Sequence, residues 1–240
     1  MLIIFYTLLT VLSCVSSVKV LTQKPSVLTE QKGNSVIMDC NIAKDESNYV
    51  FWYKQLPNAT PQFVLRYYHS HGSPDKYGDS FSSNRFTSKA KSNIDYQLII
   101  NNVEIGDSAV YYCGTWDSSV SENVFGQGTK LMVSDSAVPP PVVNILPSSE
   151  DQSSSKITLV CLINDMPMGF ADVRWLVNGI SVTDGVFTSS AEQQPNEKFK
   201  MSSYFTTESS EWEKDKDLTC EVTVGSRATA RNIKKSQCSD

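Results

Sequence analysis

Apolar and polar residues alternate along much of this chain with the period of two that is typical of a half-buried β-strand. The alternating runs are short, are separated by turn-forming residues, and do not have the spacing of an amphipathic helix. In residues 51–55, Trp52 falls on one face of the predicted strand, and Tyr53 and Gln55 fall on the other. Further strands are predicted over residues 36–40, 63–68, 96–100, 125–133 and 157–163. We therefore expect an all-β protein.

Cysteine, tryptophan and tyrosine residues occur at linked positions in the first half of the chain. Trp52 lies between Cys40 and Cys113, and Tyr111 comes two positions before Cys113. This pattern is typical of an immunoglobulin β-sandwich, in which a disulfide joins the two sheets, the indole packs against it, and the tyrosine hydroxyl bonds back to nearby backbone. The pattern predicts the disulfide Cys40–Cys113. In variable domains an aspartate at the position of Asp107 commonly pairs with an arginine, here Arg85.

The same cysteine and tryptophan pattern occurs again in the second half. Trp175 lies between Cys161 and Cys220, which predicts a second sandwich with the disulfide Cys161–Cys220. The cysteines are 73 residues apart in the first half (40 to 113) and 59 apart in the second (161 to 220). The longer interval matches the extra edge hairpin of a variable-type domain. The expected order is therefore a variable-type domain followed by a constant-type domain.

Domain boundaries follow from composition. Residues 2–12 are almost wholly apolar and residues 13–17 are small and polar, which predicts a secretory signal peptide. A transmembrane anchor is one alternative, but the run is shorter than the ~20 residues that span a bilayer. Lipid attachment at Cys14 is a second alternative. The proline-rich segment 135–141 is predicted to be a stiff linker. We expect a signal peptide (1–17), a variable-type domain (18–134), the linker (135–141) and a constant-type domain (142–240).

Four short segments carry a more specific resemblance. Phe125-Gly126-Gln127-Gly128 looks like the joining segment of an immunoglobulin light chain or a T-cell receptor chain. Residues 114–119 resemble a lambda third hypervariable loop, and residues 158–163 resemble a lambda constant domain, as does the terminal Cys238-Ser239. Over the whole mature chain the sequence resembles a lambda-like immunoglobulin light chain. Phe125 in place of Trp separates it from a heavy chain, and the missing connecting peptide and membrane span separate it from a T-cell receptor chain.

The chain departs from that family at a few positions. Leu218 stands where the constant domain usually has a tyrosine, and Pro167 comes one place early for the family's Tyr-Pro pair. Arg66 stands where a light chain usually carries tyrosine. These departures favour a divergent, non-mammalian vertebrate lineage over a different function.

The resemblance implies an antigen-binding surface made of three loops, approximately residues 41–50, 67–76 and 114–124. Their aromatic side chains offer rigid contact area, and their Asn, Ser and Gly residues offer adaptable hydrogen bonds. The alternative is that they are ordinary solvent loops. The residues predicted to contact antigen are Tyr49, Tyr67, Tyr68, His69, His71, Trp116 and Asp117.

A second surface is implied where light chains meet the heavy chain. Strand alternation supports it, because Trp52 and Cys113 point inward and their neighbours Tyr53, Gln55 and Tyr112 therefore point outward. Scattered surface apolar residues are the alternative interpretation. The predicted heavy-chain interface consists of Tyr53, Gln55, Pro61, Phe63, Tyr112 and Phe125 in the variable-type domain, and Val160, Leu162 and Tyr204 in the constant-type domain.

Two further residues are candidates for covalent modification. Cys238 is left over after the two disulfides, and an odd cysteine in a secreted chain suggests a bridge to another chain, here the heavy chain. Asn58-Ala59-Thr60 matches the acceptor sequence for N-glycosylation and falls in a predicted turn, with an unused sequon as the alternative.

Composition excludes several other functions. The chain has 21 Lys and Arg against 26 Asp and Glu, a net charge of −5, which argues against a nucleic-acid or anionic-membrane surface. His69 and His71 are the only histidines, and no third ligand supports a metal site. We find no catalytic constellation, and expect no enzyme activity and no cofactor. No apolar run follows Cys238, so no membrane span of the chain's own is expected.

Three hypotheses remain. The first is a secreted antibody light chain that contributes to antigen binding, also present at the cell surface when its heavy chain is membrane-bound. The second is a surrogate-type light chain, or another secreted immunoglobulin-family partner, without its own antigen. The third is a secreted enzyme of sandwich fold. The complete junction from Cys113 to Gly128 favours the first.

Overall fold

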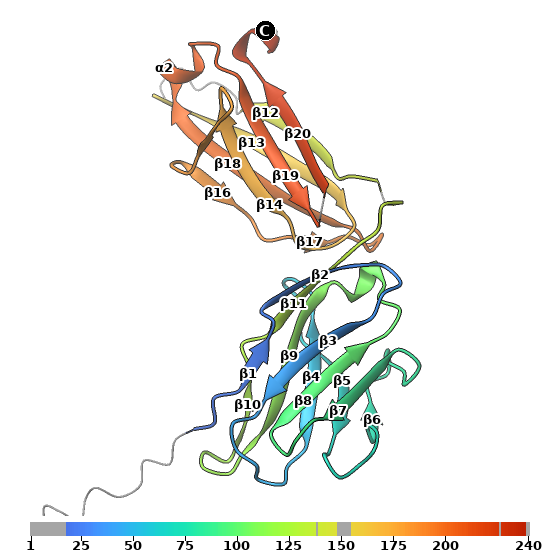
Figure 1. The fold of residues 1–240 in the computed structure, drawn as a ribbon. Coiled ribbons are helices and arrows are strands. Elements are labelled where there is room, and N and C mark those ends of the chain that lie inside the picture. The colour runs from blue at the N-terminus through green and yellow to red at the C-terminus, as the bar shows by residue number, and fades with distance from the viewer. Residues whose placement is uncertain (1–17, 138, 148–154, 226, 239–240) are drawn as a thin grey trace, which may run out of the picture.

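Two β-sandwiches follow one another along the chain in the computed structural model (Figure 1). The structure describes residues 18–137, 139–147, 155–225 and 227–238. The predicted signal peptide, with Cys14, lies outside the described residues. The last strand of the first sandwich ends at Ser134, and the first strand of the second begins at Val142.

The first sandwich contains two sheets and a short 3-10 helix. Its elements are β1 (Thr22–Lys24), β2 (Val27–Gln31), β3 (Val36–Asn41), β4 (Val50–Gln55), β5 (Gln62–Tyr67), β6 (Lys76–Tyr77), β7 (Phe86–Ala90), β8 (Asp95–Ile100), η1 (Ile105–Asp107), β9 (Ala109–Asp117), β10 (Glu122–Phe125) and β11 (Thr129–Ser134). One sheet has the strand order β1-β3-β8-β7, and the other has β2-β11-β9-β4-β5-β6, with β10 paired to β9. Burial alternates along β3 and β8, as the sequence pattern predicts.

The second sandwich has the same general plan with fewer strands. Its elements are β12 (Val142–Pro147), β13 (Lys156–Met166), β14 (Asp172–Val177), β15 (Ile180–Val182), β16 (Val186–Thr188), β17 (Glu192–Gln193), β18 (Phe199–Glu208), α2 (Ser209–Trp212), β19 (Leu218–Val224), β20 (Arg227–Ile233) and η2 (Lys235–Gln237). The sheets have the strand orders β12-β13-β18-β16, with β17 paired to β18, and β15-β14-β19-β20.

Both predicted disulfides are confirmed, and each crosses between the two sheets of its sandwich. Cys40–Cys113 joins β3 to β9, and Cys161–Cys220 joins β13 to β19, with Cα–Cα distances of 6.4 Å in both. The side chains of Trp52 and Trp175 are completely buried in the two cores. In the register of β4 and β9, Trp52 lies directly opposite Cys113, so the indole is on the disulfide's side of the sheet.

The turn before β9 contains the predicted tyrosine corner and the predicted ion pair. The hydroxyl of Tyr111 donates to the carbonyl of Asp107 at 2.9 Å, and burial raises the pKa of Tyr111 well above its usual value. The Arg85 guanidinium contacts the Asp107 carboxylate, which also accepts the Glu104 N–H at 2.8 Å. In the second sandwich Leu218 is buried where the family has its tyrosine, so a hydroxyl bond of this kind is absent at that position.

The last predicted strand of the first sandwich, residues 125–133, is interrupted at residues 126–128. The buried side chain of Gln23 fills the break. Its amide nitrogen donates to the Tyr111 carbonyl at 2.9 Å, and its oxygen accepts the N–H groups of Cys113 and Gly128, both at 3.1 Å. Gly128 has φ +89°, a conformation that favours glycine. A side chain thus supplies hydrogen bonds that a neighbouring strand would otherwise make.

Candidate functional site

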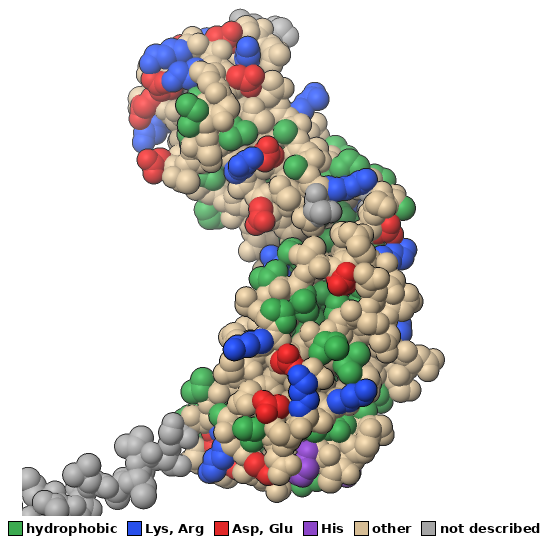
Figure 2. Space-filling model, viewed as in Figure 1, with side chains coloured by type: hydrophobic (Ala, Val, Ile, Leu, Met, Phe, Trp, Pro, Cys, Tyr) green, Lys and Arg blue, Asp and Glu red, His purple; other side chains and the backbone are tan. Residues whose placement is uncertain are grey.

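The three predicted loops gather at the end of the first sandwich that faces away from the second (Figure 1). They connect β3 to β4, β5 to β6, and β9 to β10. Contacts between the loops show the convergence: the Thr115 hydroxyl donates to the Tyr49 carbonyl at 2.9 Å, and the rings of Tyr49 and Tyr68 are 5.3 Å apart. Histidine side chains lie at the same end in the space-filling view (Figure 2). Below, this end of the molecule is called the loop end.

Four of the predicted contact residues form one aromatic cluster. Tyr68 lies 4.6 Å from His69 and 5.3 Å from His71, measured between ring centroids, and Tyr49 packs against Tyr68. These rings are half-buried, except for that of His71, which is exposed. The cluster offers a preformed aromatic surface whose side chains hold one another in place.

Arg66 belongs to this cluster although it was not predicted as a site residue. Its guanidinium lies 4.2 Å from the centre of the Tyr49 ring and makes two hydrogen bonds to Asp75, at 3.0 and 2.9 Å. The pairing with Asp75 raises the pKa of Arg66 and lowers that of Asp75. The signal was present in the sequence, because Arg66 stands where light chains usually carry tyrosine.

Two of the predicted contact residues need correction. Tyr67 ends β5 with its side chain only 5% exposed, and its ring packs at 6.1 Å against that of Tyr96, so it is a core residue. Asp117 is 1% exposed, and its carboxylate accepts the N–H groups of Lys19 and Ser119. Neither side chain offers contact surface. Trp116, which directly precedes Asp117 on β9, does offer contact surface, because it is 39% exposed.

The predicted interface of the first sandwich lies on the sheet that contains β4, β5, β9 and β10. The Tyr53 ring packs edge-on against those of Phe63 and Phe125, each at 5.7 Å. Phe125 is 51% exposed and lies against Gly114, where a Cβ would clash with its ring. The remaining predicted members are Gln55 and Tyr112, which are half-buried, and Pro61, which is exposed. Below, the six residues are called the variable face.

The predicted interface of the second sandwich contains a row of apolar residues across four strands. Strand registers place Leu146 opposite Val160, Val160 opposite Tyr204, and Tyr204 opposite Phe187. Leu146 is 51% and Phe187 66% exposed, and neither was predicted. Leu162, two positions after Val160, is half-buried beside the row. Below, these five residues are called the constant face.

Cys238 is the free cysteine of the described residues. It directly follows η2, is half-buried, and its thiol donates a weak hydrogen bond to the Lys234 carbonyl at 3.7 Å. The thiol therefore rests against its own domain with part of its surface open to solvent.

Asn58 is an exposed residue in the turn between β4 and β5. Its side-chain nitrogen, to which a glycan would be attached, donates to the carbonyl of Ala191 in the second sandwich at 2.6 Å. Glycosylation of Asn58 stays a prediction, and a glycan would compete with this contact between the domains.

The residues that the structure describes lack both the side-chain groupings of metal sites and the helices of membrane spans. They contain no group of three or more His, Cys, Asp or Glu side chains placed to hold a metal ion. Among the same residues, no helix combines the length and the apolar character needed to cross a bilayer.

Comparison with known proteins matches both sandwiches. The family model for the Immunoglobulin V-set domain matches residues 23–134, and that for the Immunoglobulin C1-set domain matches residues 143–226. One similar protein is a viral T-cell receptor beta chain-like protein of Feline leukemia virus, 30% identical over 192 residues. The match covers 77% of this chain and 58% of that protein.

Proposed function

Because the chain belongs to the immunoglobulin superfamily, as a V-set domain followed by a C1-set domain, we propose that it is an antibody light chain. The superfamily's V-set and C1-set domains are non-enzymatic binding modules that suit an extracellular or cell-surface protein, and they typically pair with another immunoglobulin chain. In the proposed role the chain is secreted, pairs with a heavy chain, and contributes its loop end to antigen binding.

The observation that carries the proposal is that both domains present an apolar face on one sheet. On the variable face the Tyr53 ring packs against both Phe63 and Phe125, and on the constant face Val160 and Tyr204 lie in one cross-strand row. Aromatic residues gathered on an exposed sheet mark a protein interface. The loop end lies on the same domain as the variable face, so that a partner's loops could extend the recognition surface.

A T-cell-receptor-type chain is the second candidate. The similarity to a protein described as T-cell receptor beta chain-like favours it. The resemblance of residues 114–119 and 158–163 to lambda light chains favours the antibody chain. Both candidates predict pairing through the variable and constant faces, and they differ in the partner.

Replacing Cys238 by serine is expected to release the chain from its partner under denaturing, non-reducing conditions. The half-buried thiol directly follows η2, and the exposed part of its surface is open to a second chain. The natural product should migrate as a larger disulfide-linked species, and the Cys238→Ser chain as a free species, with association under native conditions largely retained.

Mass spectrometry of the wild-type species then identifies the partner. An immunoglobulin heavy chain supports the light-chain proposal, and a T-cell-receptor-type chain supports the second candidate. A wild-type chain that migrates as a free monomer from its natural source would contradict the interchain disulfide.

Truncation of Phe125 and of Trp116 is expected to separate pairing from recognition. Phe125→Ala should weaken partner association by about 2 kcal/mol, as at central aromatic positions of other interfaces. Trp116→Ala should reduce binding to a cognate antigen by a similar amount and leave association nearly unchanged. Both side chains lie outside the buried core of the domain, so the melting temperature of the isolated chain should change little.

The matched control is Ile180→Ala. Ile180 is 72% exposed on β15, in the sheet opposite the constant face, and should affect neither measurement. Loss of antigen binding without loss of pairing in Phe125→Ala, or unfolding of Trp116→Ala, would contradict the placement of the two surfaces.

A further inference from the structure

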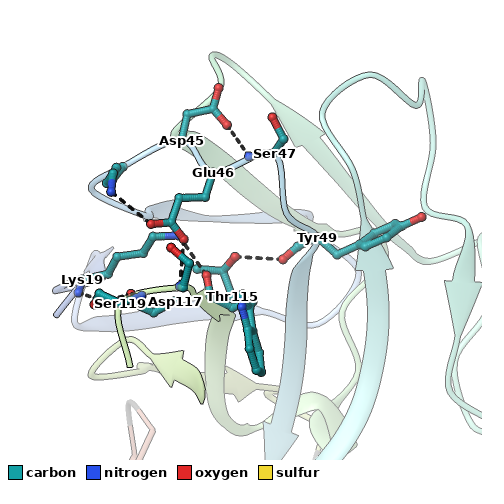
Figure 3. Close-up of polar contacts among 11 residues, drawn as sticks. Lys19, Asp45, Glu46, Ser47, Tyr49, Thr115, Asp117 and Ser119 are labelled. Atoms are coloured by element: carbon teal, nitrogen blue, oxygen red, sulfur yellow. Dashed lines mark hydrogen bonds and ion pairs between the residues drawn. The ribbon is translucent and has the colours of Figure 1, made fainter. Parts of the chain in front are cut away.

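Lys19 is a buried cation at the loop end. Its side chain is only 2% exposed, which is rare for lysine unless the ammonium group is paired. The Nζ atom lies 2.9 Å from Glu46 Oε2 and donates to the Trp116 carbonyl, also at 2.9 Å (Figure 3). One ammonium group thus contacts the loop between β3 and β4 and the end of β9.

Glu46 links the same two segments directly. Its Oε2 atom, which faces Lys19, also accepts the backbone N–H of Ser118 at 3.0 Å. Its Oε1 atom lies 3.2 Å from Nζ of Lys44, whose side chain is 68% exposed. The carboxylate of the first loop is therefore held between a buried cation and an amide of the third loop.

Asp117 holds the backbone of Lys19 from the opposite side. Its Oδ2 atom accepts the Lys19 N–H at 2.6 Å, and its Oδ1 atom accepts the N–H and hydroxyl of Ser119 at 2.8 and 2.6 Å (Figure 3). Lys19 therefore uses both its side chain and its backbone to contact the β9–β10 segment. Residues close to the amino end, the first loop and the third loop meet in one hydrogen-bonded network.

We propose that Lys19 is a positioning residue that clamps the first loop to the third loop and so fixes the arrangement of the recognition surface. Trp116, whose carbonyl accepts the Lys19 ammonium, is the exposed aromatic residue that this clamp would orient. A surface ordered before binding loses less conformational entropy when it binds. The proposal rests on the proposed function only in treating these loops as the recognition surface.

The charges of the network support this geometry. The pKa of Glu46 is lowered from 4.5 to about 2. The hydrogen bond from Lys19 makes the largest contribution, and the Ser118 N–H makes the next. The pKa of Asp117 is lowered from 3.8 to about 2. The backbone N–H of Lys19 makes the largest contribution, and the side chain of Ser119 makes the next. Both carboxylates are thus ionised at pH 5–7, where the folded state gains the full benefit of their contacts.

The pH dependence of the clamp follows from these lowered values. The stabilising contribution of each carboxylate is complete above its ordinary pKa of 4.5 or 3.8, and it is lost as the pH falls through about 2. The charged groups that face Glu46 are Lys19 and Lys44, and the one that faces Asp117 is Lys19. The neighbouring Asp45 instead accepts the Ser47 N–H and the Asn93 amide.

Amide hydrogen exchange on the full chain tests the clamp without an antigen or a partner. Lys19→Met keeps the length of the side chain and removes the ammonium group. Exchange at Ser118 and in residues 41–50 should accelerate about tenfold, because local opening becomes easier. Exchange in residues 36–40 of β3 and in residues 109–113 of β9 should stay unchanged. The control is Lys24→Met. Lys24 is an exposed lysine of β1, and its replacement should change exchange neither at the loop end nor in the inner strands.

Carboxyl titration by NMR provides a second, sharper readout. Lys19→Met removes the ammonium group that faces Glu46 but keeps the backbone N–H that Asp117 accepts. The pKa of Glu46 should therefore rise from about 2 toward 4.5, while that of Asp117 stays low. A purely structural lysine whose loss loosens the whole domain would move both values together.

Defined outcomes would overturn the proposal. It fails if Ser118 keeps its protection in Lys19→Met, or if exchange rises equally in the inner strands. Should Lys19→Met not fold, Glu46→Gln replaces it, since a neutral amide oxygen can still accept the Ser118 N–H while the attraction to Lys19 is lost. Unchanged exchange at residues 41–50 and 114–119 in Glu46→Gln would equally refute the clamp. The clamp can hold even if the partner is not a heavy chain, so the two proposals fail separately.

Discussion

Truncating Trp52 to alanine is expected to cost about 3–5 kcal/mol of the free energy of unfolding of the variable-type domain. The indole is completely buried opposite Cys113, so its loss leaves a cavity that the two sheets, held by the Cys40–Cys113 disulfide, can only partly close. A domain of this size has a total stability of about 5–15 kcal/mol, so the variant should be near the limit of folding. Calorimetry that resolves the two domain transitions measures the change.

The constant-type domain supplies the control, because its transition should not move in the Trp52→Ala chain. A comparison of phenylalanine variants is sharper still. Trp175 Nε1 donates to the Ser203 hydroxyl at 3.0 Å, whereas the buried Trp52 Nε1 has no hydrogen-bond partner among the described residues. Trp175→Phe should therefore cost about 1 kcal/mol more in its domain than Trp52→Phe in its own. An equal or reversed order would show that packing differences outweigh the hydrogen bond.

Asp107→Ala is expected to destabilise the variable-type domain by about 3 kcal/mol, because it removes one partner from a buried charge network. The carboxylate is 5% exposed, contacts Arg85, and lies 3.9 Å from the Lys54 ammonium. Burial already lowers the pKa of Lys54, so its charge depends on nearby acids. Without Asp107 the two cations lose their buried counter-charge, and the Glu104 N–H loses its acceptor. Urea unfolding of the full chain measures the loss.

A surface ion pair in the same domain provides the matched comparison. Lys91 lies 3.3 Å from Asp39, and both side chains are at least half exposed, so Lys91→Ala should cost less than about 1 kcal/mol. Asp107→Asn should fall between the two, since it keeps an acceptor for the Glu104 N–H and loses only the charge. If Asp107→Ala cost no more than Lys91→Ala, the Arg85 pair would contribute no more than an ordinary surface contact.

Much of the fold could be predicted from the sequence because its determinants are regular spacings. The disulfides, the buried Trp52 and Trp175 and the corner bond of Tyr111 all follow from linked positions of distinctive residue types. The outward direction of Tyr53 and Tyr112 follows from the alternation of a strand whose inner residues are known. These features require only that each strand be recognised and its inner face identified.

The loop end could be predicted in outline but not residue by residue. Tyr67 and Asp117 fall within predicted loop segments, yet both are buried by partners distant in sequence, Tyr96 in one case and Lys19 in the other. A loop has no fixed period, so its sequence does not indicate which side chains point inward. The sequence shows that the loops are rich in aromatic residues, including those around Tyr68. It does not show that the Arg66 guanidinium stacks on the Tyr49 ring.

The sequence alone therefore determined the two sandwiches, their order, their disulfides and the outward-facing side of strands such as that of Tyr53 and Gln55, because repeated spacing and alternation encode them locally. Only the tertiary structure decided that Gln23 fills the break after Phe125, and that Lys19 meets Glu46 and Asp117. The contacts of Gln23 with Gly128 and of Lys19 with Asp117 join segments about a hundred residues apart, and a single polar side chain carries no mark of its distant partner. They exist because packing of the two sheets excludes water there, and each buried polar group then needs a protein partner.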